Sequence, residues 1–436
     1  MNILILGSGG REHAFAFKIS QSPRCKKLFI APGNAGTAAL GENVSIDPTS
    51  FPEIGDFVAS NDVGLVVVGP EVPLALGIRD YFEQREDIQH VPLVGPDKRG
   101  ALLESSKDFA KQFMNKYGIP TAQYATFDHT QIKQGLEYIQ NQKVPIVLKA
   151  DGLAAGKGVI ICNSHGEAEM VFKEMLLESK FGQAGSKVVI EEFLEGIEIS
   201  VFVLTDGKSY KILPSAKDYK RIGENESGPN TGGMGAVSPV PFADREFMDK
   251  VETRIVIPTV EGLKAEGIHY CGFIFLGLIN VAGEPMVIEY NARMGDPETQ
   301  VVFPRVASDL VDLLWHTTKG TLDQVQLEVD SRCACTIVMV SGGYPGQYEK
   351  GNPIEGLEKP TDNMVFHAGT RLDQGQVVTN GGRVLAITAY GEQPQDAVES
   401  AYETARGIKW KDTYYRTDIG QDLLRWPNKA LETSTE

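Results

Sequence analysis

Short apolar runs, each ending in glycine or proline, divide the first part of the chain. They cover residues 3–6, 28–30, 64–68 and 91–94, and a helix is predicted over 11–19 after the first run. Buried β-runs closed by Gly/Pro turns are typical of a parallel sheet with helices on both faces. We therefore predict an N-terminal parallel α/β domain over residues 1–104.

Polar residues follow three of these predicted strands, and ligands of parallel sheets bind beyond the carboxyl ends of the strands. Gly9 and Gly10 follow the first strand, Asn34 the second and Glu71 the third. The first turn begins as G-x-G, but Glu12 stands where a dinucleotide fingerprint has its third glycine, and no ribose-binding acid ends the second strand. We predict a phosphorylated sugar here, with its phosphate at the helix N-terminus after Gly10 and Glu71 available to hydroxyls or an amine. A tight turn without a ligand is the alternative.

A second region with a different pattern begins near residue 102. A predicted helix over 106–117 carries Lys107 near its start, and a predicted strand over 145–148 ends at Lys149. The glycine-rich segment 150–158 follows, and then another predicted strand over 159–162. The pattern predicts a hairpin with a long loop that contains lysine.

The loop of this hairpin does not match a P-loop. Only three residues separate Gly152 from Gly156, and Gly158 replaces the serine or threonine that would follow Lys157. A strand follows, so no helix dipole faces the loop. Glycines nevertheless allow backbone N–H groups to fold over phosphates, which predicts a phosphate-covering loop; a plain hairpin turn is the alternative.

A predicted strand over 188–190 runs into the acidic linker EEFLEGIE, residues 191–198. Such a linker can present backbone N–H and C=O groups to an adenine edge. Glu191 is a candidate acceptor for the exocyclic amine, and Glu198 for ribose hydroxyls. The other linker residues expected at the nucleotide are Glu192, Phe193 and Leu194. The alternative is a set of solvated surface acids.

The segment 286–300, MVIEYNARMGDPETQ, carries the densest set of candidate site residues. Glu289 and Asn291 lie two residues apart in a predicted strand, so both side chains leave the same face. A carboxylate and an amide oxygen form a pair suited to Mg²⁺ that already carries phosphate oxygens. Arg293, at the same spacing, adds donors for a carboxylate or phosphate. An edge strand with solvated polar residues is the alternative.

Composition and charge limit the class of protein. The chain has 436 residues, 42% of them hydrophobic, and a formal net charge of −16. This length predicts about three domains, and the negative charge argues against a binder of nucleic acid or anionic membranes. The five cysteines are scattered, so we expect them to be reduced and buried. No segment reads as a signal peptide or membrane span, which predicts a cytoplasmic protein.

The last hundred residues predict a small mixed domain. Strands are expected over 333–340, 364–368 and 384–389, a helix over 395–406, and a frayed end after 429. The predicted fold class is α/β and α+β multidomain. Its parts are the N-terminal sheet, a central domain over 105–330 with a lid subdomain at about 122–192, and a C-terminal α+β domain over 331–428.

Several segments together resemble the phosphoribosylamine–glycine ligase (glycinamide ribonucleotide synthetase) family of ATP-grasp enzymes. They occur in the family's order as GSGGREHA (7–14), PGNAG (32–36), GPEVPL (69–74), KADGLAAGKGV (149–159), EEFLEG (191–196), KDYKR (217–221), PNTGGMGA (229–236) and EYNARMGDPETQ (289–300). The chain departs from the family pattern at Tyr219, where many relatives have histidine. A second acidic metal ligand is also absent from residues 273–279.

The resemblance implies an ATP-dependent reaction of glycine with 5-phosphoribosylamine through a glycyl phosphate, in purine biosynthesis. It implies catalytic roles for Lys149, Lys157, Arg293 and Asp218, and nucleotide contacts from Lys107, Lys149, the glycines of 152–158 and residues 191–198. It further implies substrate contacts from Gly9, Gly10, Asn34, Glu71, Lys217, Arg221, Gly232, Gly233 and Asp296. Glu289 and Asn291 would hold Mg²⁺ or Mn²⁺.

The expected partners are ATP, glycine and phosphoribosylamine, without nucleic acid or membrane. A transient contact with the enzyme that supplies phosphoribosylamine and a monomeric or weakly dimeric state are further expectations. Two alternatives remain open. One is another ATP-grasp carboxylate–amine ligase or a biotin-carboxylase-like enzyme, and the other is a nucleotide-binding module without turnover.

Overall fold

Five parallel strands form the N-terminal sheet, in the order β3-β2-β1-β4-β5. The computed structural model describes residues 1–153, 158–177 and 186–424. The strands are β1 (Asn2–Gly7), β2 (Lys27–Pro32), β3 (Glu42–Asn43), β4 (Val63–Val68) and β5 (Leu93–Val94). The helices that follow them in the chain are α1 (Gly10–Ser20), α2 (Phe51–Ser60), α3 (Glu71–Leu76) and α4 (Ile78–Gln84). The predicted parallel sheet is confirmed, and the ends of β1, β2 and β4 meet at one edge.

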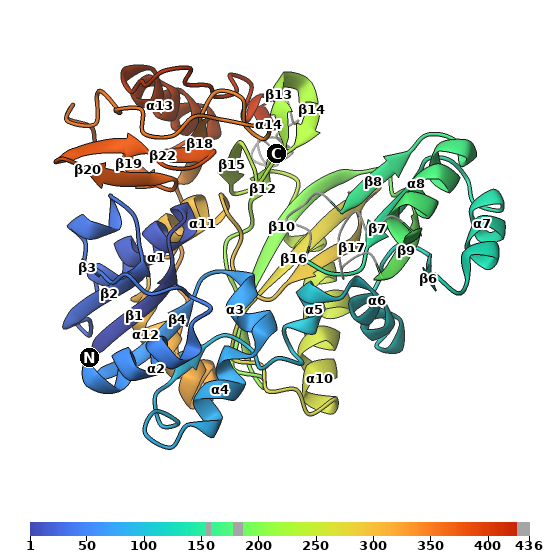
Figure 1. Ribbon diagram of the computed structural model, residues 1–436, viewed down its shortest axis with the longest axis horizontal. Coiled ribbons are helices and arrows are strands. Elements are labelled where there is room, and N and C mark those ends of the chain that lie inside the picture. The colour runs from blue at the N-terminus through green and yellow to red at the C-terminus, as the bar shows by residue number, and fades with distance from the viewer. Residues whose placement is uncertain (154–157, 178–185, 425–436) are drawn as a thin grey trace, which may run out of the picture.

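Two helices from late in the chain return to this sheet (Figure 1). They are α11 (Thr299–Arg305) and α12 (Leu310–Lys319). Phe15 of α1 packs edge-to-face on Phe303 of α11, with ring centroids 4.6 Å apart. The segment that leaves the candidate metal-binding strand is therefore anchored on the N-terminal domain.

The central region contains two antiparallel sheets. The lid sheet has the order β6-β9-β7-β8 and consists of β6 (Tyr124–Asp128), β9 (Lys187–Glu192), β7 (Ile146–Ala150) and β8 (Val159–Cys162). Its two helices are α7 (Ile132–Gln140) and α8 (His165–Leu177). Leu148, Phe172 and Ile190 belong to a core confined to this lid, so the lid is a packed unit of its own.

The second central sheet has the order β11-β10-β16-β17. Its strands are β10 (Ile197–Thr205), β11 (Tyr210–Ile212), β16 (Gly272–Val281) and β17 (Glu284–Asn291). The helices of this region are α5 (Leu102–Ser105), α6 (Lys107–Lys116), α9 (Arg245–Val251) and α10 (Ile257–Ala265). In Figure 1, α5 and α6 lie below both the lid sheet and this sheet; Lys107 of α6 reaches the lid at Gly152, and α6 also contacts β17.

The C-terminal sheet combines strands from two distant parts of the chain, in the order β12-β15-β18-β22-β19. They are β12 (Lys217–Asp218), β15 (Gly235–Ser238), β18 (Cys333–Val340), β19 (Met364–His367) and β22 (Arg383–Gly391). The two small hairpins are β13 (Arg221–Gly223) with β14 (Ser227–Asn230), and β20 (Thr370–Asp373) with β21 (Gln376–Thr379). The helices are α13 (Pro394–Gly407) and α14 (Gln421–Leu424). Hence residues 217–238, which follow the lid in sequence, fold with the C-terminal domain.

The strands and helices expected from the sequence are found within a few residues of their predicted bounds. All five cysteines are free, as expected, but Cys25, in the loop between α1 and β2, is only half-buried. The predicted frayed end after residue 429 lies outside the described residues. Among the helices of the described ranges, none has the length and apolar character that crossing a membrane requires.

Candidate active site

A cavity of about 300 Å³ lies where the N-terminal and C-terminal domains meet. Gly9 and Asn34 line it from the ends of β1 and β2, and Asp296 lines it from the loop before α11. The C-terminal domain contributes the remaining wall with Tyr344, Ala368, Gly369, Thr370, Asn380 and Arg383. The sequence prediction named only the N-terminal wall and Asp296. Polar groups from both domains therefore face one space of the size of a small phosphorylated ligand.

Asn34 shapes this cavity through its amide side chain. Its Nδ2 donates to the carbonyl oxygens of Ser8 (2.9 Å) and His367 (2.8 Å). Its Oδ1 accepts from the N–H groups of Gly36 (2.9 Å) and Thr37 (3.0 Å). All four hydrogen-bonding positions of the amide are thus occupied. Its backbone is engaged too, since its N–H donates to Thr37 Oγ1 (2.8 Å) and its carbonyl oxygen accepts from Asn43 Nδ2 (2.7 Å), so Asn34 shapes the loop rather than offering free groups to a ligand.

Arg383 joins three parts of the site, and no motif in the sequence marked it. Its Nη1 donates to the carbonyl oxygens of Gly232 and Asp296, both at 2.6 Å, and its Nη2 lies 3.3 Å from Oδ2 of Asp296. Burial by itself raises the pKa of Asp296, but Arg383 and Arg11 outweigh it and hold this pKa below its ordinary value. Gly233 has φ +115°, and a Cβ there would collide with Pro297, which explains a glycine at this position. The glycine loop and Asp296 are therefore held together by one guanidinium.

Arg293 lies between two carboxylates. Its Nη2 is 2.8 Å from Oε1 of Glu104, and its Nε is 3.3 Å from Oε2 of Glu71. The Nε–H is buried and makes no hydrogen bond of good geometry. Burial tends to raise the pKa of Glu71, but Arg293 and Arg11 lower it overall. The structure thus brings Arg293 and Glu71 together and leaves the Nε–H of Arg293 as a buried donor for an incoming anion. The sequence analysis did not identify Glu104, because nothing in its sequence context marks it.

Acidic residues gather on the face of β12 that carries Asp218. Lys220 Nζ lies 2.7 Å from Oε2 of Glu198, and Ser200 Oγ donates to Oε1 of Glu298 at 3.3 Å. Burial and the nearby Asp218 raise the pKa of Glu298 to about 7. Burial likewise raises the pKa of Asp218. This group can attract an ammonium and exchange a proton near neutral pH.

Lys217 lies on the opposite face of β12. Its Nζ is 2.9 Å from Oδ2 of Asp422 and 3.8 Å from the ring centroid of Tyr219. Tyr219 donates its hydroxyl proton to the same carboxylate at 2.5 Å. Adjacent strand residues point to opposite faces, so Asp218 faces the site while Lys217 and Tyr219 face α14. The substrate contact expected of Lys217 remains a prediction. Its pairing with Asp422, on the face away from the site, does not favour that contact.

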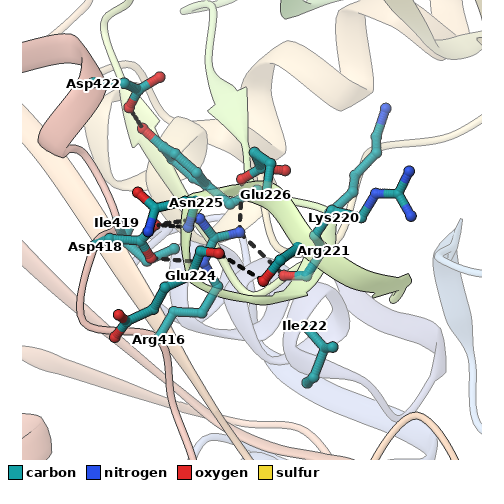
Figure 2. A network of polar contacts seen from close by, with 12 residues as sticks. Lys220, Arg221, Ile222, Glu224, Asn225, Glu226, Arg416, Asp418, Ile419 and Asp422 are labelled. Atoms are coloured by element: carbon teal, nitrogen blue, oxygen red, sulfur yellow. Dashed lines mark hydrogen bonds and ion pairs between the residues drawn. The ribbon is translucent and has the colours of Figure 1, made fainter.

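Figure 2 shows how the segment after β12 is held by the end of the chain. The guanidinium of Arg416, 1% exposed, donates to Glu226 Oε1 (2.7 Å), to Asp418 (2.8 Å) and to the carbonyl oxygen of Arg221 (3.1 Å). The side chains of Lys220 and Arg221 extend away from this cluster, and Arg221 donates to the carbonyl oxygen of Gly228 (2.8 Å). The hairpin β13–β14 is thereby clamped, which orients Lys220 toward Glu198.

Of the predicted nucleotide residues, Lys149 and Glu191 lie on lid strands β7 and β9, and Lys107 begins α6. Lys107 Nζ donates to the carbonyl oxygen of Gly152 (3.1 Å), and Lys149 Nζ donates to that of Ile288 (3.1 Å). Glu191 is 3% exposed, and its Oε1 lies 2.9 Å from Lys149 Nζ without hydrogen-bond geometry. Glu191 therefore retains a buried acceptor, as adenine recognition would require.

The remaining predicted nucleotide residues differ in exposure and in hydrogen bonding. Glu192 accepts from the N–H of Gln123 (2.9 Å), and the side chain of Phe193 is 41% exposed beside Leu194. Gly158 closes the hairpin, because its carbonyl accepts from the N–H of Ala150 (2.8 Å). The predicted Gly156 and Lys157 lie outside the described residues.

Glu289 and Asn291, the predicted metal pair, both lie on strand β17. They are opposite Gly277 and Phe275 of β16, so no second acid faces Glu289 across the strands. Within the described ranges neither side chain takes part in a hydrogen bond or ion pair, although Glu289 lies close enough to Lys107 and Lys220 to act to raise their pKa values. Their oxygens are therefore free, and one carboxylate with one amide suits Mg²⁺, which commonly takes its remaining ligands from phosphates and water.

Comparisons with known proteins agree with this geometry. Three family models of phosphoribosylglycinamide synthetase match the chain: the N domain at residues 1–104, the ATP-grasp (A) domain at 105–299 and the C domain at 334–422. The phosphoribosylamine–glycine ligase of Pseudomonas aeruginosa is 49% identical over 425 residues, which cover 96% of this chain and 97% of that protein. That of Pasteurella multocida is 47% identical over 435 residues, covering 99% and 100%.

Solved structures show the same relationship. The phosphoribosylamine–glycine ligase of Thermotoga maritima superposes with a TM-score of 0.83 at 34% identity, covering 96% of this chain and 100% of that one. The biotin carboxylase domain of a Hydrogenobacter thermophilus carboxylase reaches a TM-score of 0.71 at 15% identity and shares the fold alone. Because the family models and relatives span nearly its full length, the chain belongs to the phosphoribosylglycinamide synthetase family.

Proposed function

We propose that this chain joins glycine to 5-phosphoribosylamine with ATP, giving N1-(5-phosphoribosyl)glycinamide, ADP and phosphate. One observation carries the proposal. The segment 289–296 connects the two halves of the site, because Glu289 and Asn291 lie on β17 near the lid lysines while Asp296 lines the cavity between the domains. Arg293 lies between them. Phosphoryl transfer and sugar binding can therefore occur at opposite ends of one short segment.

The first step activates the carboxylate of glycine. A carboxylate is a poor electrophile, so one of its oxygens attacks the γ-phosphorus of ATP and ADP leaves, which yields glycyl phosphate. We propose that Lys107 of α6 and Lys149 of β7 bind the phosphates, assisted by Lys157; the proposal is supported by their ammonium groups reaching the carbonyl oxygens of Gly152 and Ile288. Positioning and neutralisation of charge supply most of the catalysis in such transfers.

A divalent cation fits the proposed site at Glu289 and Asn291. Their free oxygens on one face of β17 would hold Mg²⁺ or Mn²⁺. When bound, the ion neutralises charge on the phosphates of ATP.

In the second step the amine of phosphoribosylamine attacks the acyl carbon, and phosphate leaves. The cavity near Gly9 and Arg383 is proposed to hold the phosphoribosyl group, with Arg383 supplying positive charge at its mouth. The buried Nε–H of Arg293 is a donor for the acyl phosphate. The attacking amine must lose a proton, and Glu298, with its pKa raised to about 7, is a suitable acceptor.

The test is ADP release measured in a coupled assay with phosphoribosylamine present. We expect turnover with glycine and much slower turnover with alanine or serine. Lys149→Met should abolish it because a phosphate contact is lost. ADP release that depends on bicarbonate instead of glycine would favour the biotin-carboxylase-like alternative, and nucleotide binding without turnover would favour a binding module.

We further propose that the enzyme works as a monomer or weak dimer and receives phosphoribosylamine through a transient contact with the enzyme that makes it. Sedimentation of the purified chain over a range of concentrations tests the first point.

A further inference from the structure

Helix α6 presents two lysines, one turn apart, to the nucleotide side of the lid. Lys107 Nζ reaches the carbonyl oxygen of Gly152 at the edge of the glycine-rich loop. Lys111 lies one turn further along and is only 2% exposed. Residues four apart share a helix face, so both ammonium groups point toward the lid. A lysine this buried requires partners for its charge and its N–H groups.

Lys111 has three acceptors, one for each N–H of an ammonium. They are Glu191 Oε2 (3.0 Å), Thr121 Oγ1 (2.8 Å) and the carbonyl oxygen of Ala122 (3.4 Å). Thr121 in turn donates to the carbonyl oxygen of Val287 (2.7 Å). Val287 belongs to β17, the strand of Glu289, so Lys111 is fixed relative to both the lid and the proposed metal pair.

Glu191 is shared by two lysines from different elements. Its Oε2 faces Lys111, while its Oε1 lies 2.9 Å from Nζ of Lys149 on the neighbouring strand β7. Oε1 accepts no hydrogen bond of good geometry, and Lys149 directs a proton to the carbonyl oxygen of Ile288. Two ammonium groups thus compete for one buried carboxylate, and Glu192 and Glu198 add negative charge nearby. Such charges interact strongly because they are poorly screened.

We infer that Lys111 is a positioning residue of the nucleotide site, acting through Glu191. By occupying the far oxygen of Glu191, it leaves Oε1 to accept the adenine amine and leaves Lys149 to bind phosphate. Without Lys111, the carboxylate would turn wholly to Lys149, and this pair would withhold both groups from the nucleotide. The inference rests on the proposed function in taking ATP as the ligand of this site.

Burial lowers the pKa of Lys111 to about 8, although Glu191 acts to raise it. The lysine is therefore charged at neutral pH and loses its proton in mildly alkaline solution. This agrees with a role that depends on its charge.

The test compares Lys111→Met with a matched control, Lys116→Met, on the same helix. Lys116 is exposed and pairs with Glu266, far from the lid. Lys111→Met should raise KM for ATP about 10- to 100-fold, the range seen for groups that orient ligand-binding residues. We expect kcat to fall as well, because Lys149 is drawn away from the phosphate, whereas KM for glycine should change less than about threefold. Lys116→Met should change none of these values.

Nucleotide selectivity shows whether Lys111 positions Glu191 or only stabilises the fold. Purine riboside triphosphate lacks the adenine amine, so it should bind the unsubstituted enzyme more weakly than ATP. Lys111→Met should remove most of this preference, because Glu191 no longer presents Oε1. Equal weakening of both nucleotides, or a lower melting temperature alone, would refute the inference. If Lys111→Met does not fold, Lys111→Gln removes the charge while keeping a donor, and the same outcomes apply.

A double-substitution cycle tests whether Lys111 acts through Glu191. In a Glu191→Gln background, Lys111→Met should change KM for ATP by less than about threefold, because no carboxylate remains to be oriented. Multiplying effects would contradict the inference. Lys149→Met distinguishes an error in the proposed nucleotide site from an error in the role of Lys111. If it leaves ATP affinity intact, the proposed nucleotide site is wrong, whereas weakening by Lys149→Met but not by Lys111→Met overturns only the role of Lys111.

Discussion

Acid should loosen the contact between the N-terminal and C-terminal domains through two histidines. His13 of α1 is 7% exposed, and its Nδ1 accepts the backbone N–H of His367 at 2.7 Å. An imidazole nitrogen that accepts a hydrogen bond is unprotonated, so His13 is neutral here. Burial, with His367 adding to it, lowers the pKa of His13 from 6.5 to about 3. Burial lowers the pKa of His367 to about 4.

The sign of the effect follows from where each proton binds. Above pH 6.5 both histidines are neutral in the folded and unfolded chain, so they contribute no pH dependence. Between pH 6.5 and the lowered pKa values, the unfolded chain binds protons that the folded chain excludes. The free energy of unfolding therefore decreases as the pH is lowered through this range. At about pH 4.5, two units below the ordinary pKa, the loss is roughly 2 to 3 kcal/mol for each histidine.

The measurement is urea unfolding of the enzyme and of His13→Gln at about pH 7 and about pH 4.5. Glutamine does not titrate, and its amide oxygen can accept the same N–H. We expect the substituted chain to lose roughly 2 to 3 kcal/mol less on acidification than the parent. His129→Gln, at an exposed position, should behave like the parent. Equal losses in the parent and His13→Gln would refute the reasoning.

Three further predictions concern the site. Glu289→Gln should raise the Mg²⁺ concentration needed for half-maximal activity at least about tenfold, because a charged metal ligand becomes neutral; an unchanged Mg²⁺ titration would exclude Glu289 from the metal site. Arg383→Ala should weaken binding of ribose 5-phosphate about 10- to 100-fold in calorimetry while sparing ATP, since it removes the cation of the cavity; the reverse pattern would assign the cavity to another ligand. Arg416→Met should lower the free energy of unfolding by about 1 to 3 kcal/mol and speed proteolysis of hairpin β13–β14, because Glu226 and Asp418 lose their partner. Unchanged proteolysis would mean that the hairpin does not depend on this clamp.

Local patterns predicted the strands and their turns because these depend on neighbouring residues. The apolar run before Gly9 became β1, and the alternation around Glu289 placed it and Asn291 on one face of β17. Strands β7 and β8, on the two sides of the glycine-rich segment, pair antiparallel as expected for a hairpin. Residues that act through contacts distant in sequence were missed. Lys111, Glu104 and Arg383 stand in unremarkable sequence, and their charged partners Glu191, Arg293 and Asp296 lie 80, 189 and 87 positions away.

The sequence by itself determined the parallel N-terminal sheet, the hairpin with its lysines, the candidate metal strand and the family. Each depends on spacing within one segment or on the order of segments. Only the tertiary structure decided which neighbours each of these side chains contacts. Lys217 pairs with Asp422, and the side-chain amide of Asn34 is hydrogen-bonded within the protein. Arg383 pairs with Asp296 at the wall of the cavity. The physical reason is that charge pairing and hydrogen bonding are satisfied in space by whichever groups the packed sheets bring within about 3 Å, and linear order does not specify those neighbours.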